Sequence, residues 1–408
     1  MKLTGIGKFV LFILAIGLAA GGWRWWQQQQ ATGGGSTPIT KTPRQNTPAP
    51  GKGSTPSTTI TAPTTVADNE ILFVITPAKK GWVTDQIKAF NDQSGGKYKV
   101  VTAPAPSREG MHAILNGKIK PVLWSPGSPM WPQRLGEVWK ARTAGTIVDM
   151  NDPNGHRAFL RTPLVFMTTK TKAKFLRPLL SGPQVWANIR DLSLGKRKVP
   201  WGKFKFSHAD PLTSSSGTMT LGLIMVDYAN RTGQSGSLDR LATDKKFLRY
   251  LTELERSFVY DADVEKGTTA LTKAFVKNPS RYDFITAYES AALEAAPTNP
   301  ELTVIYPNPT AVSEHAVTLL SGGWITPTQR EGALAFIAFL GGKEALEDGL
   351  KYHFRPAQSG GSLSLNPELS RFGGQGFAQS YSSIELPSYQ ALNAAIYQWR
   401  VKVARKAG

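Results

Sequence analysis

Short apolar runs and amphipathic stretches alternate along the chain from residue 69 onward. Residues 71–75 form a continuous apolar run that is rich in β-branched and aromatic side chains and ends at Thr76-Pro77. Such a run predicts a strand that is buried on both faces. Val83, Ile87 and Phe90 then recur at helical spacing, which predicts an amphipathic helix directly after that strand.

The same alternation continues toward the carboxyl terminus. Further extended segments are predicted at 98–102, 122–124, 163–167, 282–288 and 303–307, and further helices at 107–117, 217–233, 331–340 and 389–403. The order of strand, polar loop, helix and strand predicts parallel βαβ units and an open, doubly wound α/β sheet.

The first 68 residues differ from the rest in composition. A short basic start followed by an apolar stretch indicates an export segment over residues 1–26. Small residues at 19–21 could end a cleaved signal peptide, whereas the three tryptophans between 23 and 26 favour an uncleaved membrane anchor. Residues 27–68 are rich in Gln, Thr, Pro, Ser and Gly, which predicts a disordered tether.

Charge and cysteine content narrow the classes of partner. The 408-residue chain carries a formal charge of +19, and because six of its 48 basic and one of its 29 acidic residues precede Asn69, the remainder is itself about +14. A field of that sign favours anionic ligands or an acidic surface. No arginine-rich run or nucleic-acid-binding motif is present, so we expect no nucleic-acid partner. The absence of cysteine excludes disulfides, thiolate metal sites and a lipid-modified cysteine anchor.

Hydroxyl side chains gather at the predicted junctions between strands and helices. In open α/β sheets, ligands collect at these junctions, where helix amino termini leave N–H groups unpaired and carry a partial positive charge. A serine or threonine there also serves as an ordinary helix cap, which is the alternative interpretation for each one. The candidates are Thr76, Ser107, Ser125 with Ser128, Thr213 to Ser216, and Thr268 with Thr269. Gly217 follows the four-hydroxyl run and would let the backbone approach a ligand.

No pattern typical of an enzyme or a metal site is present. The chain lacks a nucleophile elbow, a Walker loop and a dinucleotide fingerprint. Its five histidines are far apart without metal-binding spacing, and the acidic cluster 261–265 lacks the pattern of a calcium loop. Trp124 and Trp131 could stack on an organic ligand, although a place in the core is the commoner role. We therefore expect no cofactor, no metal and no catalysis.

The order of these segments resembles the type 2 periplasmic solute-binding proteins of ABC importers. The likeness is to the branch that includes the molybdate- and sulfate-binding proteins and the similar proteins joined to von Willebrand A domains. The segments that carry it are 71–91, 117–121, 208–217, 282–289, 324–330 and 354–357. They extend over nearly all of the sequence between Asn69 and Ala357.

The resemblance implies a Venus-flytrap fold, in which two doubly wound α/β lobes are joined by two crossover strands. We place the crossovers at 163–169 and 303–307, the first lobe at 69–162 and 304–408, and the second lobe at 163–303. The resemblance implies ligand contacts at Thr76, Ser107, Thr213, Ser214, Ser215, Ser216, either Thr268 or Thr269, and Tyr288, and the junction argument adds Ser125. Glu289 departs from the oxyanion pattern, because a carboxylate there could instead hold a cation or an amine.

The expected function is the capture of a small, anionic solute for an ABC importer outside the cytoplasmic membrane. The expected partners are the solute, an ABC permease and, through the amino-terminal segment, the membrane. The alternative is a tethered sensory or surface-interaction module with a membrane-bound signalling partner. An enzyme on the same fold would need a carboxylate or histidine in the cleft, for which Glu289 is the candidate.

Overall fold

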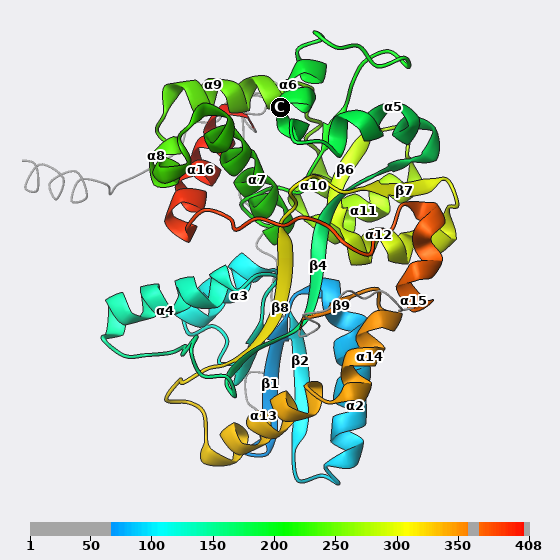
Figure 1. Ribbon diagram of the computed structural model, residues 1–408. Helices are drawn as coiled ribbons and strands as arrows, with labels where there is room; N and C mark the ends of the chain where they lie inside the picture. The colour runs from blue at the N-terminus through cyan, green and yellow to red at the C-terminus, as the bar shows by residue number, and fades with distance from the viewer. Residues whose placement is uncertain (1–66, 358–366, 404–408) are drawn as a thin grey trace, which may run out of the picture. The chain divides into compact units, whose positions relative to one another are not determined.

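The computed structural model describes residues 67–357 and 367–403 (Figure 1). The predicted export segment and all but the last two residues of the predicted tether lie outside these residues. The described part is built around one long strand, β4 (His156–Thr169), which takes part in two sheets. Each sheet forms the centre of one lobe, so the α/β, two-lobed architecture is confirmed.

The first lobe contains a mixed sheet in the order β2-β1-β3-β8-β4, with β9 paired to β4. Strand β1 runs parallel to both of its neighbours, whereas β8 runs antiparallel to β3 and β4. Its elements are β1 (Glu70–Ile75), η1 (Pro77–Lys79), α2 (Lys80–Gln93), β2 (Lys99–Pro104), α3 (Ser107–Leu115), β3 (Leu123–Ser125), α4 (Met130–Thr143), β8 (Val312–Leu319), α13 (Pro327–Leu340), α14 (Lys343–Lys351) and β9 (Arg355–Pro356).

Strand β1 is buried on both faces, as its apolar run predicts. Ile71, Phe73 and Ile75 belong to a core cluster with side chains of α2 and α13, whereas Leu72 and Val74 belong to another cluster with side chains of α3 and α4. Alternate side chains of a strand point to opposite faces, so helices cover this sheet on both sides. The carboxyl end of β1 is thereby fixed, and Thr76 follows it directly.

The second lobe contains the sheet β7-β4-β6-β5, in which β5 and β6 are parallel and β4 is antiparallel to β6 and β7. A single large core cluster joins this sheet to its helices. Its elements are α5 (Lys170–Leu180), α6 (Val185–Ser193), β5 (Phe206–Ser207), α7 (Ser215–Thr232), η2 (Ser235–Ser237), α8 (Leu238–Leu241), α9 (Lys245–Leu254), η3 (Glu255–Ser257), α10 (Ala262–Glu265), α11 (Thr268–Lys277), β6 (Phe284–Tyr288), α12 (Glu289–Ala295), η4 (Ala296–Thr298) and β7 (Leu302–Ile305).

The two lobes are joined close to the predicted crossovers but not at the same residues. Strand β4 leaves the first sheet at Pro163 and pairs within the second from Leu164, so 164–169 already belong to the second lobe. Residues 302–305 are β7, which pairs only with the second-lobe half of β4. The second crossing is therefore made by residues 306–311, between β7 and β8 (Figure 1). The predicted crossover at 303–307 begins too early in the chain, because an extended apolar segment does not reveal which sheet it joins.

The carboxyl-terminal segment corrects the expectation that residues 304–408 belong to the first lobe. After α15 (Pro367–Ser370) and η5 (Arg371–Gln375), the chain returns to the second lobe and ends in α16 (Tyr389–Lys402). Leu392, Ile396 and Trp399 of α16 lie in the core cluster of the second lobe, and the helix contacts α7, α8 and α9. The amphipathic pattern predicted this helix, but an apolar stripe does not specify the surface that it covers.

His208 lies in the contact between α16 and the rest of the second lobe. Its ring centroid is 4.6 Å from that of Phe258 and 5.7 Å from that of Trp399. The Nε2 atom is 3.0 Å from Oε1 of Glu255, and both side chains are buried. Burial lowers the pKa of His208, but the carboxylate of Glu255 and the carbonyl of Ala209 outweigh burial, so the pKa is raised from its ordinary value of 6.5.

This raised pKa predicts a pH dependence of stability with a definite sign. The unfolded chain releases the imidazole proton near pH 6.5, so the pair stabilises the fold fully below that pH and loses its contribution as the pH rises through the folded-state pKa. We expect the free energy of unfolding of the full chain, minus that of His208→Gln, to be largest at acid pH and to shrink above pH 6.5. Urea unfolding of both chains across this range measures the difference, and a difference that grows with pH would contradict the assignment.

Candidate ligand-binding site between the lobes

A cavity of about 100 Å³ lies between the two lobes. Eight of the predicted ligand contacts line it, namely Thr76, Ser107, Thr213, Ser214, Ser215, Thr268, Thr269 and Tyr288. The first lobe supplies Thr76 and Ser107, and the second lobe supplies the others. Residues from six separate parts of the chain thus meet at one point, as the junction argument predicts. The volume is well below the ~300 Å³ of the smallest drug-sized pockets, so in this conformation the cavity accommodates a small group only.

Three α-helices begin at this cavity. Helix α3 begins at Ser107, α7 at Ser215 and α11 at Thr268, and none of the three has a side-chain cap at its amino terminus. The N–H groups of a first helical turn have no partner within the helix, and together they give the helix end a partial positive charge. Three uncapped amino termini around one cavity form a site for negative charge.

The side chains that line the cavity have the same electrostatic preference. Among the described residues that line it, none carries a carboxylate, and Lys266 carries a positive charge. Thr76 is 8% exposed, and its Oγ1 atom is buried with no hydrogen-bond partner within the described residues. A buried hydroxyl without a partner is costly, and a ligand oxygen would satisfy it.

The lobes touch at the inner wall of the cavity. The Ser215 hydroxyl donates to Oγ of Ser107 at 3.0 Å, and Nε1 of Trp131 donates to Oγ of Ser215 at 3.0 Å. The N–H of Gly127 also donates to the Ser107 hydroxyl at 3.0 Å. A Cβ atom at Gly127 would lie 3.0 Å from Oγ of Ser215 and 3.4 Å from the Tyr288 hydroxyl, so this glycine permits the close approach. The structure thus shows the lobes closed on each other.

Ser216 differs from its neighbours because its side chain is completely buried beneath the cavity. Its hydroxyl bonds that of Thr268, and the Ser214 hydroxyl lies 2.9 Å from Oγ1 of Thr268 and 3.2 Å from Oγ of Ser216. Ser216, predicted as a ligand contact, thus does not line the cavity and instead bonds Ser214 and Thr268 from behind. Helical geometry explains the result, because Ser215 and Ser216 point 100° apart at the start of α7.

Ser125 also lies outside the cavity, contrary to the prediction. Its side chain is fully buried, accepts a hydrogen bond from Nζ of Lys79 at 2.6 Å and donates to the carbonyl of Ala316 at 2.7 Å. Lys79 donates further to the carbonyls of Ser125 and Pro126, so it fixes the loop that carries Gly127. Burial holds the pKa of Lys79 well below its ordinary value. Nothing in the sequence distinguishes this buried lysine from the exposed Lys80 beside it.

Tyr288 and His315 complete the wall behind the cavity. The Tyr288 ring lies 6.1 Å from that of His315, and burial raises the pKa of Tyr288, so its hydroxyl remains a neutral donor. Burial first, and the nearby Lys79 second, hold the pKa of His315 well below its ordinary value. Its Nε2 atom lies 3.2 Å from the Ser313 hydroxyl, which donates to the carbonyl of Gly127. The wall therefore consists of neutral dipoles.

Glu289 faces away from the cavity and is engaged in a buried ion pair. Its Oε1 and Oε2 atoms accept from Nε and Nη2 of Arg355 at 2.7 Å and 2.6 Å, and the Tyr306 hydroxyl donates to Oε2. The two charged side chains are 0% and 2% exposed. Glu289 does not line the cavity, because a partner 66 residues away binds it, and its role as a ligand contact or a catalytic carboxylate is not proposed further. The pair joins α12 of the second lobe to β9 of the first.

Gly217 serves the packing of α7 and not the approach of a ligand. A Cβ atom at this position would lie 2.1 Å from the carbonyl oxygen of Ala209 and 2.8 Å from backbone atoms of Asp210 and Pro211. The loop 209–211 therefore lies directly against the first turn of α7. This contact sets where the helix begins, and with it the position of Ser214 and Ser215 at the cavity.

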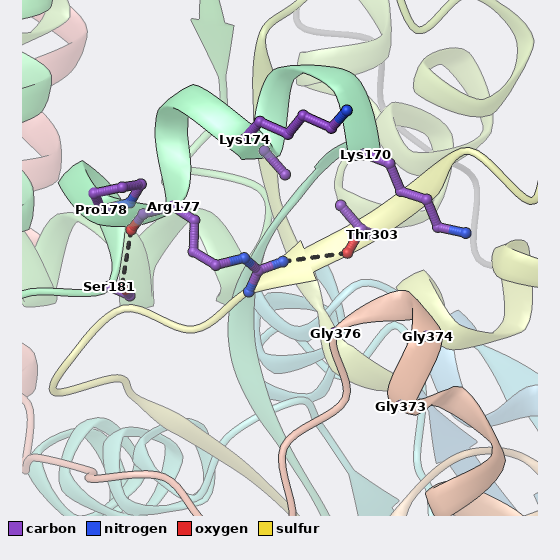
Figure 2. A pocket seen from close by; sticks show the side chains of 10 residues that line it. Lys170, Lys174, Arg177, Pro178, Ser181, Thr303, Gly373, Gly374 and Gly376 are labelled. Carbon is purple, nitrogen blue, oxygen red and sulfur yellow. Dashed lines mark hydrogen bonds between the residues drawn. The ribbon is translucent and has the colours of Figure 1, made fainter.

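A second cavity, of about 590 Å³, lies on the second lobe between α5, β7 and η5 (Figure 2). Lys170, Lys174 and Arg177 line it from α5. The Arg177 guanidinium donates to the carbonyl of Val304 at 3.2 Å and to the Thr303 hydroxyl at 3.4 Å, so it ties α5 to β7. None of the predicted ligand contacts lines this basic cavity, which is therefore separate from the site between the lobes.

The described residues contain neither a metal-binding cluster nor a membrane-spanning helix. Within the described ranges, no group of three or more histidine, aspartate or glutamate side chains could hold a metal ion. Of the helices in those ranges, none has the length and apolarity needed to cross a bilayer.

Comparison with solved structures places the fold among periplasmic binding proteins. The iron-bound HitA from Pseudomonas aeruginosa aligns with a TM-score of 0.55 at 13% identity, over 83% of this chain and 99% of that one. The fructose-6-phosphate-bound periplasmic binding protein AfuA from Actinobacillus pleuropneumoniae gives 0.56 at 15%, over 82% and 99%. The sulfate-binding protein SubI from Mycobacterium tuberculosis H37Rv gives 0.53 at 17%, over 83% and 99%. At these identities the likeness shows the fold alone.

Comparison of the sequence identifies the family. A search of curated protein sequences gave no match. The model of the bacterial extracellular solute-binding proteins, in contrast, matches residues 71–355, which include every element from the second residue of β1 to the start of β9. The match thus extends over both walls of the cavity and both crossings between the lobes. By this match and by its two-lobed fold, the chain belongs to the bacterial extracellular solute-binding proteins of ABC transporters.

Proposed function

We propose that this protein captures a small anionic solute in the cavity between its lobes and delivers it to an ABC permease. The observation that carries the proposal is the convergence of three uncapped helix amino termini on a cavity whose lining contains hydroxyls, one lysine and no carboxylate. Such a set of donors stabilises negative charge and offers little to a cation. Binding and release of the solute require no chemical step.

The two walls explain how capture would be coupled to closure. Thr76 and the amino terminus of α3 belong to the first lobe, whereas the amino termini of α7 and α11 belong to the second. An anion that contacts both sets binds the closed conformation more tightly than the open one, and that difference drives closure. The crossings at 163–164 and 306–311 are where we expect the chain to bend.

Export and membrane attachment belong to the same proposal. Members of this family act outside the cytoplasm, and the basic and apolar residues of segment 1–26 are typical of an export signal or an anchor. The tryptophans at its end favour an anchor. The polar segment 27–68 would then act as a spacer between the membrane and the lobes, within reach of a permease.

The unpartnered Thr76 hydroxyl provides a sharp test of this site. Because Oγ1 of Thr76 makes no hydrogen bond to any described residue, Thr76→Val removes the proposed ligand contact without breaking a known bond in the fold. We expect its affinity for sulfate or phosphate, measured by calorimetry on the full chain, to fall about tenfold or more, since hydrogen bonds to charged groups contribute about 1.5–3 kcal/mol.

Thr272→Val is the matched control for this experiment. The Thr272 hydroxyl is also buried and unpartnered, but Thr272 does not line the cavity. Its replacement should leave the affinity for either inorganic anion unchanged. Equal affinities of the Thr76 variant and the native chain, or equal losses in both variants, would refute the assignment of the cavity.

A further inference from the structure

A much larger groove adjoins the cavity between the lobes. This outer groove has a volume of about 600 Å³ and shares Pro77, Ala78, Thr268, Thr269 and Tyr288 with the inner cavity. It is bounded by the start of α2 in the first lobe and by α11 and α12 in the second. The shared lining residues therefore place the two spaces side by side between the lobes.

The outer groove differs in chemistry from the inner cavity. Its walls are mostly carbon surface, contributed by Ala78, Val276, Ala291, Ala295, Tyr352 and Phe354. Three exposed lysines, Lys80, Lys273 and Lys277, line it from both lobes, against one exposed carboxylate, Glu294. An apolar surface with lysines around it suits the organic part of an anion and does not suit a second inorganic ion.

The floor of the outer groove is built to a definite shape. A Cβ atom at Gly81 would lie 2.5 Å from the ring of Tyr352, so the absence of a side chain lets this ring approach α2 closely. The Tyr352 hydroxyl donates to Asp85, which holds the ring in place. In α11, Oγ1 of Thr272 is buried, lines the groove and has no partner within the described residues. It offers one polar contact within the apolar wall.

We propose that the natural solute is an organic anion, with its charged head in the inner cavity and its apolar body in the outer groove. This inference rests on the proposed function and adds the class of solute. An inorganic oxyanion would fill the inner ~100 Å³ and leave about 600 Å³ of shaped groove unused. Together the two spaces reach the size range of sites for organic ligands, about 300–1,000 Å³.

Matched pairs of probes test the inference on the full chain. Calorimetry would compare inorganic phosphate with phenyl phosphate, and sulfate with benzenesulfonate, so that each pair shares a head group. We expect the aryl member of at least one pair to bind about tenfold tighter, because burial of part of a phenyl ring is worth about that factor. Ala295→Trp, which fills the outer groove, should remove this advantage and leave the inorganic anions unaffected. Val276→Trp should have the same effect from α11.

A control and the possible outcomes keep the two proposals separate. Ala338→Trp places the same large side chain at an exposed position of α13, outside the groove. This variant should retain the aryl preference. If inorganic anions bind and Thr76→Val weakens them, but aryl anions bind no tighter, this inference fails and the proposed function stands. An aryl preference that survives in both groove variants also overturns it. If no anion binds, the proposed function fails and takes the inference with it.

Discussion

Replacing Arg355 with methionine should lower the free energy of unfolding by about 3–5 kcal/mol, the cost of leaving a buried charge without its partner. The two side chains of the pair are almost completely buried, and two hydrogen bonds of 2.6–2.7 Å join them. Arg355 also donates to the carbonyl of Gln379 and lies between the rings of Phe377 and Tyr381, at 4.8 Å and 4.7 Å. Urea unfolding of the full chain measures the loss.

A double variant separates the effect of charge from that of packing. In Glu289→Leu/Arg355→Met both charges are gone, and we expect much of the lost stability to return, since apolar residues often replace a buried ion pair without net cost. Lys343→Met removes one member of an exposed ion pair and should leave stability unchanged. A single Arg355 variant as stable as the native chain would show that the pair does not hold α12 to β9.

Gly217→Ala should destabilise the fold by about 3 kcal/mol, at the upper end of what a single added methyl group costs in a packed interior. The new Cβ would meet the backbone of residues 209–211, and its closest contact would be 2.1 Å from a carbonyl oxygen. Backbone moves less readily than a side chain end, so α7 and its amino terminus must shift. Thermal and urea unfolding measure the loss of stability, and calorimetry with sulfate should show weaker binding as well.

Gly236→Ala is the matched control for Gly217→Ala. A Cβ atom at Gly236 would meet nothing within 4 Å, and the residue is exposed in the same lobe. We expect a change within about 0.5 kcal/mol, as for ordinary surface positions. If Gly217→Ala were as harmless as Gly236→Ala, the close packing of loop 209–211 on α7 would not determine where that helix begins.

Local patterns in the sequence predicted many of the elements, although not β8 or α4, and most of the cavity lining. The apolar run 71–75 is β1, and the hydroxyls at Thr76, Ser107, Ser215 and Thr268 come together because all of them stand where a strand or loop passes into a helix. That rule depends only on neighbouring residues and on the geometry of α/β sheets, so a single sequence suffices for it. Whether these hydroxyls bind a solute stays a prediction.

What the sequence did not predict depends on partners far along the chain. Glu289 is identified as structural by Arg355, and Ser125 by Lys79 and Ala316, none of which is a sequence neighbour. The position of α16 on the second lobe depends on an apolar surface formed by α7, α8 and α9. Periodicity shows that such residues are buried but not against what, and charge patterns do not distinguish a buried lysine from an exposed one.

The return of the chain to the second lobe gives the molecule a third covalent connection beside its two crossings. Residues 382–384 of this connection pair with Thr310. The N–H of Thr310 donates to the carbonyl of Ser382, and the N–H of Ile384 donates to the carbonyl of Thr310. Three connections restrict the relative motion of the lobes more than two, because a twist of one lobe against the other would break the hydrogen bonds between the paired backbones. We therefore expect the lobes to separate by rotation about one axis, so that opening changes the width of the cleft more than the alignment of its two walls.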